Sequence, residues 1–89
     1  MPRFSGMDIG QVRNLSRQLE RESNEIRNTL AQLTSQLESA PWKGSDRERF
    51  IGEWKSRHFA ALQRVADGLA TASRHAAEFA NRQEAASRV

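Results

Sequence analysis

The apolar residues of this chain recur at helical spacing in two long segments that a single short turn separates. In the first segment they follow one another at steps of three, four or seven positions, at Val12, Leu15, Leu19, Ile26, Leu30, Leu33 and Leu37. At ~100° per residue these side chains fall within ~60° of one another on a helix. The pattern predicts a helix over residues 8–39, with Asp8 as its N-cap and a narrow apolar stripe. One rung is missing, because Glu22 and Ser23 occupy a turn where another apolar residue belongs.

The second segment follows Gly44 and has a wider stripe. Its apolar positions recur at similar steps, at Phe50, Trp54, Ala61, Val65, Leu69, Ala72, Ala76 and Phe79. Ser45 and Glu48 match a capping box, in which each side chain bonds to the backbone N–H of the other residue. The pattern predicts a second helix over residues 46–85, with a stripe of ~120° that Ile51 and Leu62 widen.

Residues 40–45 form the predicted turn. Pro41 disfavours helix at Ala40, and Gly44 is expected to adopt a positive φ or to permit close backbone approach. Two long helices joined by so short a connection most simply run antiparallel, so the predicted fold class is all-α, a helical hairpin. Trp42 belongs to neither stripe. It either folds back to cap the end of the hairpin or forms part of a contact with a partner, and the spacing alone does not decide.

The length of the chain indicates one small domain with a modest core. It has 89 residues and no cysteine, so neither a disulfide nor a thiolate zinc site is available to stabilise it. One neighbouring helix covers only part of the wider stripe, and apolar surface that remains exposed favours association. We therefore expect two hairpins to dimerise into a four-helix bundle.

Composition and motifs argue against several other functions. The 14 Lys and Arg residues are interspersed with 11 Asp and Glu residues, which predicts a solvated surface and no nucleic-acid partner. The narrow stripe of the first helix lacks a basic amphipathic pattern, so membrane contact is unsupported. His58 and His75 lie ~25 Å apart along one helix and cannot share a metal ion. No phosphate loop or nucleophile motif is present, so we expect no enzyme, no catalytic residue and no cofactor.

The tripeptide Trp42-Lys43-Gly44, centrally placed between two amphipathic helices, resembles the W-x-G turn of the WxG family of Esx proteins. Phe50 and Trp54 extend the likeness to the W-x-G…F…W pattern of actinobacterial members, and the likeness covers nearly the whole chain. The resemblance implies a hairpin that pairs as a homodimer or heterodimer into a four-helix bundle. It also implies export of the folded dimer by a type VII secretion system. The protein would then be cytoplasmic before export and secreted afterwards without a cleaved signal, in agreement with the absence of a leader-like apolar run in residues 1–10.

The resemblance also implies a composite export signal. In the family, the W-x-G turn lies near the partner's C-terminal tail, whose Y-x-x-x-D/E element is read by an ATPase of the secretion machine. Trp42 and Gly44 match the turn, but the chain has no tyrosine, and its nearest imitation of the tail is Phe79 followed by Gln83. We therefore expect it to leave with a WxG-type partner that carries the tail signal. The alternative function is a cytoplasmic adaptor or chaperone-like partner of a larger toxin or effector.

Overall fold

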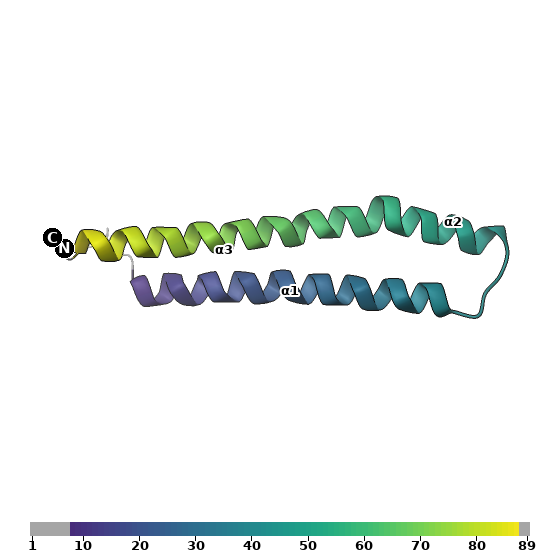
Figure 1. The fold of residues 1–89 in the computed structure, drawn as a ribbon, viewed down its shortest axis with the longest axis horizontal. Helices are drawn as coiled ribbons and strands as arrows, with labels where there is room; N and C mark the ends of the chain where they lie inside the picture. The colour runs from purple at the N-terminus through teal and green to yellow at the C-terminus, as the bar shows by residue number, and fades with distance from the viewer. Residues whose placement is uncertain (1–7, 88–89) are drawn as a thin grey trace.

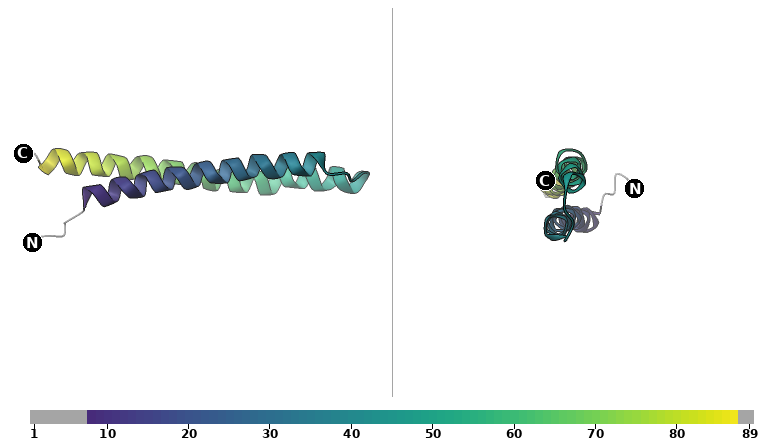
Figure 2. Two further views of the ribbon diagram at one scale, coloured as in Figure 1. Left: turned by 90° about the horizontal axis from the view of Figure 1, so that it is seen from below. Right: turned by 90° about the vertical axis from the view of Figure 1, so that its right-hand side faces the viewer.

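The computed structural model describes residues 8–87 and is all-helical there, which confirms the all-α part of the predicted fold class. Its elements are α1 (Ile9–Ser39), α2 (Ser45–Glu53), the π-helix η1 (Trp54–Phe59) and α3 (Ala60–Ser87). α1 runs antiparallel to α3, while α2 and η1 continue the line of α3 to the turn (Figure 1). The molecule is a rod of 67 × 18 × 17 Å. Seen from the end of the rod, α1 lies alongside the line of α2, η1 and α3 (Figure 2).

α1 has the predicted N-cap. The backbone of Asp8 is extended, and its carboxylate accepts a 3.1 Å hydrogen bond from the backbone N–H of Gln11. This bond satisfies one of the N–H groups that a helix leaves unpaired in its first turn. At the other end α1 stops at Ser39, and Ala40 is extended, as the following Pro41 requires.

The predicted capping box of α2 is wrong, although Gly44 has the predicted positive φ. Gly44 itself is the N-cap, with φ 99° and ψ −175°, and Ser45 is already the first helical residue. A serine inside the helix cannot cap it, so the N–H of Glu48 approaches the Gly44 carbonyl, at 3.4 Å. The Glu48 carboxylate pairs with Arg47 at 2.7 Å.

The second helical segment, predicted as one helix over residues 46–85, is helical from Ser45 to Ser87 but contains a π-turn at Trp54–Phe59. Phe59 lies seven residues before the buried Ala66, so both side chains are on the side of the helix that faces α1. In a regular α-helix the next residue on that side, four positions before Phe59, would be Lys55. The π-turn adds one residue, so Trp54 takes that place. Its indole N–H donates to the Thr34 hydroxyl at 2.7 Å.

Small residues fill the seam between α1 and α3. The buried side chains recur every seven residues, at Ser16, Ser23 and Leu30 on α1 and at Ala66, Ser73 and Ala80 on α3. The hydroxyls of Ser16 and Ser73 donate to each other's backbone carbonyls, and the Ser23 hydroxyl donates to the Ala66 carbonyl at 2.7 Å. The seam therefore buries little apolar surface, and its buried hydroxyls have partners.

Candidate interaction surface

The apolar stripes of the two helices lie beside the seam, on one face of the hairpin. We measure each side chain's direction as a rotation about its helix axis, at ~100° per residue, from the buried seam residue. The stripe of α1 lies ~40–80° from Ser23, and the stripe of α3 lies ~40–140° from Ala66 in the same rotational sense. Because the helices are antiparallel, the two stripes fall on one face. We call this surface the apolar face; it comprises Leu15, Leu19, Ile26, Leu33 and Leu37 of α1, and Leu62, Val65, Leu69, Ala72, Ala76 and Phe79 of α3.

The apolar face is largely uncovered. Five of its large side chains are 40–51% exposed, namely Leu15, Leu33, Leu62, Val65 and Phe79. A groove of about 300 Å³ runs along its middle, between Ile26, Leu30 and Leu33 of α1 and Leu62 of α3, with Glu22, Glu25 and Thr29 at its rim. Single exposed apolar residues are common in proteins, but a continuous exposed face on so thin a molecule is typical of an association site.

The opposite face is polar, and ion pairs join its two helices. Arg27 pairs with Asp67 at 2.7 Å, and Arg13 bonds to Asn81 at 2.9 Å. Near the turn, Lys55 pairs with Glu38 at 2.7 Å. The hydrogen bond from Lys55, and then its positive charge, lower the pKa of the Glu38 carboxyl below its ordinary value. The hairpin is therefore two-faced, with charged contacts closing one side and apolar side chains left exposed on the other.

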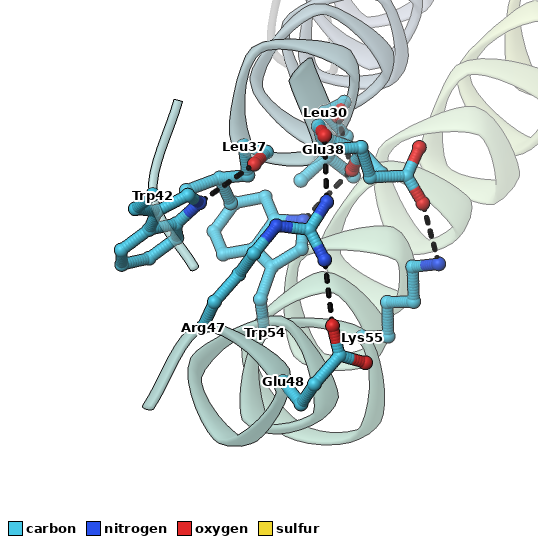
Figure 3. Close-up of polar contacts among 9 residues, drawn as sticks. Leu30, Leu37, Glu38, Trp42, Arg47, Glu48, Trp54 and Lys55 are labelled. Carbon is cyan, nitrogen blue, oxygen red and sulfur yellow. Dashed lines mark hydrogen bonds and ion pairs between the residues drawn. The ribbon is translucent and has the colours of Figure 1, made fainter. Parts of the chain in front are cut away.

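At the turn end Trp42 folds back on its own hairpin (Figure 3). Its indole N–H donates to the Leu37 carbonyl at 3.2 Å, and its ring meets Phe50 edge-on, with centroids 5.4 Å apart. Arg47 donates to the Glu38 carbonyl at 2.7 Å, so two side chains satisfy carbonyls of the last turn of α1. Trp42 thus caps the hairpin end in this structure, and it stays partly exposed.

The structure distributes the other predicted site residues over three places. Leu30 lies in the seam, and Trp54 turns toward Thr34 at the turn end (Figure 3). Phe50 lies at the turn and is half exposed. Ala61 lies at the outer edge of the apolar face, and Gly44 is exposed in the turn.

Reasoning from apolar spacing missed the seam itself. Its signal is a seven-residue recurrence of small residues, Ser16 and Ser23 on one helix and Ala66, Ser73 and Ala80 on the other. This recurrence runs beside each apolar stripe. A hydrophobicity count does not detect it, because serine and alanine contribute little to the pattern.

Residues 8–87 offer no candidate for two other kinds of site, a metal centre and a membrane-spanning helix. Within residues 8–87, no group of three or more His, Cys, Asp or Glu side chains is placed to hold a metal ion. None of the helices that the structure describes combines the length and the apolar character needed to cross a membrane. His58 lies beside Trp54, with ring centroids 6.3 Å apart.

Comparison with known proteins gives no match: no family model, no curated protein and no solved structure is similar to this chain.

Proposed function

We propose that this protein acts by association, as a small WxG-type hairpin that pairs through its apolar face with a second helical hairpin. The observation that carries the proposal is that small side chains form the contact between the two helices, while the large apolar side chains lie on one face beside it. The seam is filled by serine, alanine and one leucine, while five large apolar side chains on one face remain 40–51% exposed. A second hairpin laid on that face would complete a four-helix bundle.

The small buried core supports this proposal. The apolar side chains buried among the described residues are Leu30, Ala66 and Ala80. Burial of apolar surface contributes roughly 25 cal/mol per Å², so these three side chains, with the half-buried Leu19, Ile26, Leu37 and Leu69 beside them, supply less than an ordinary domain gains. Covering Leu15, Leu33, Leu62, Val65 and Phe79 would add the missing contribution.

For the cellular role, we propose export of the folded pair by a type VII secretion system, after assembly in the cytoplasm. The support is the Trp42-Lys43-Gly44 turn between two long helical segments, with Gly44 at positive φ. The turn also presents Phe50 half exposed beside Trp42, which leaves an aromatic surface at the tip of the rod.

The experiment follows the protein in its own host during active secretion. The proposal predicts that the chain appears in the culture medium together with a partner hairpin. It also predicts that both stay in the cell when the secretion ATPase is inactivated. Stable pairing with complete retention in the cell would replace export with the adaptor function. A chain that pairs with nothing, in cells or after purification, would contradict the association itself.

A further inference from the structure

The middle of the apolar face carries a single carboxylate, Glu22. It lies ~100° from Ser23 on the same side as Leu19 and Ile26, so it fills the rung that the stripe of α1 lacks. It also lines the apolar groove, together with Ile26 and Leu62. Within residues 8–87 its carboxylate has no ion pair and no hydrogen bond to another side chain.

No arginine or lysine is a member of the apolar face. Arg82 lies over the ring of Phe79, 5.0 Å from its centroid, and this level is ~20 Å along the rod from Glu22. The arginines of α1 and α3 lie on the polar face or at the outer edges of the helices, and several are used there, as in the pair of Arg27 with Asp67. Glu25 lies at the outer margin of α1 and adds a second negative charge beside the groove.

This distribution decides between the two kinds of partner. We infer that the apolar face is covered by a hairpin of a different chain, one whose own apolar stripe is interrupted by an arginine or lysine opposite Glu22. The inference rests on the proposed pairing and narrows it from homodimer or heterodimer to heterodimer. The partner's face must be apolar, to match Leu62 and Val65, with its positive charge near the midpoint of the rod.

A second copy of this chain is a poor occupant in either symmetric arrangement. Face-to-face hairpins related by a two-fold axis place α1 against the partner's α1 or against its α3. The first arrangement brings the two Glu22 carboxylates into the same central region. The second sets Glu22 at the level of Val65 and Leu69, because the seam aligns Ser23 with Ala66. Since no arginine or lysine is a member of the apolar face, the carboxylate has no partner within the face in either arrangement, and a buried unpaired charge strongly opposes association.

A basic residue on another chain would pair with the Glu22 carboxylate, so Glu22 favours that chain over a second copy of this one. A charge that is paired only in the correct complex lowers the stability of the wrong one, which is how buried charges commonly specify partners. Glu22 therefore keeps copies of this chain apart while the apolar face remains free for the partner.

The test compares Glu22→Leu with a matched control, Glu20→Leu. Glu20 lies two residues earlier, ~160° around α1 from Glu22, so its replacement removes the same charge but leaves the apolar face unchanged. The measurement is sedimentation equilibrium of the purified full chain at micromolar concentrations, with circular dichroism to verify helix content. Wild type and Glu20→Leu are expected to be monomers. Glu22→Leu is expected to self-associate, with a Kd lower by about tenfold or more.

A second measurement does not depend on the leucine variant. Glu22→Arg mixed with wild type tests the first arrangement, because each Glu22–Glu22 contact becomes a Glu22–Arg contact. Val65→Arg alone tests the second arrangement, because its own dimer would set an arginine opposite both Glu22 carboxylates. Either the Glu22→Arg mixture is expected to form a heterodimer that neither component forms alone, or Val65→Arg is expected to self-associate, and which of the two associates reports the orientation.

Two outcomes overturn the inference. If wild type alone is a stable dimer, or Glu22→Leu associates no better than Glu20→Leu, the selective role of Glu22 is wrong while association through the face stands. If no variant and no mixture associates, the proposed function fails together with the inference.

Discussion

Ser16 and Ser73 exchange hydrogen bonds across the seam: the hydroxyl of each donates to the backbone carbonyl of the other, at 2.8 and 2.7 Å, and the two hydroxyl oxygens lie 3.2 Å apart. Both side chains are buried. This reciprocal contact fixes the level at which α1 meets α3. It also explains how a hairpin can close with small polar side chains while its large apolar ones face outward.

We expect the two serines to be energetically coupled. Ser16→Ala and Ser73→Ala should each lower the free energy of unfolding by about 0.5–1.5 kcal/mol, because each removes one buried hydrogen bond. The double variant should lose less than the sum, since the second hydroxyl has already lost part of its network. Urea denaturation of the four proteins gives the coupling. Strictly additive losses would show that the contact does not act as a unit.

Because α1 and α3 pack closely at Ser23, a large side chain at this position should destabilise the hairpin. Ser23 is 1% exposed, so Ser23→Leu has no room between α1 and α3 and should destabilise the hairpin by about 1–3 kcal/mol. Ser35→Leu is the control, because Ser35 is exposed on the outer side of α1. The observable is the urea midpoint. Equal midpoints for the two variants would mean that the helices are not packed as closely as the buried serines indicate.

Two glycines should respond to alanine in opposite directions. Gly44→Ala forces a side chain into φ 99° and should lower stability by about 1–3 kcal/mol, although nothing lies within 4 Å of the new Cβ. Gly52→Ala, inside α2 and equally unobstructed, should raise stability by about 0.5–1 kcal/mol. Thermal unfolding measures both. A neutral Gly44→Ala variant would show that the turn can adopt another backbone conformation.

Acid should weaken the contact between Glu38 and Lys55. The pKa of Glu38 is lowered in the folded state, so its contribution to stability is complete above the ordinary value of 4.5 and is lost as the pH falls through the lower folded-state pKa. Lys55→Met should remove this dependence. The measurement is the difference in Tm between wild type and Lys55→Met from neutral to acidic pH. The difference should shrink on acidification, and a constant difference would exclude the ion pair as its cause.

The sequence predicts those parts of the structure that residue spacing or local backbone chemistry specifies. Both helical segments, the Asp8 cap and the positive φ of Gly44 follow from spacing and local chemistry. The capping box failed because a helix that starts one residue earlier places Ser45 inside it. The π-turn escaped detection because a single inserted residue leaves Phe50 and Trp54 in phase with each other.

For the apolar face, the sequence predicts which residues belong to it but not what they contact. Apolar spacing located Leu15, Leu33, Val65 and Phe79, but it could not tell whether they meet each other or a partner. That distinction depends on the residues beside them, and the small side chains Ser23 and Ala66 occupy the contact between the helices instead.

The most direct test of association through the apolar face is site-specific photo-cross-linking in the native host. A photoreactive residue is placed at Val65 on the apolar face or at Gln63, which lies two residues earlier and ~160° around the helix. Association through the apolar face predicts a cross-link from Val65, but not from Gln63, to one hairpin protein. Mass spectrometry identifies that protein and the attachment site. Cross-links of equal strength from both positions, or none from Val65, would contradict association through this face.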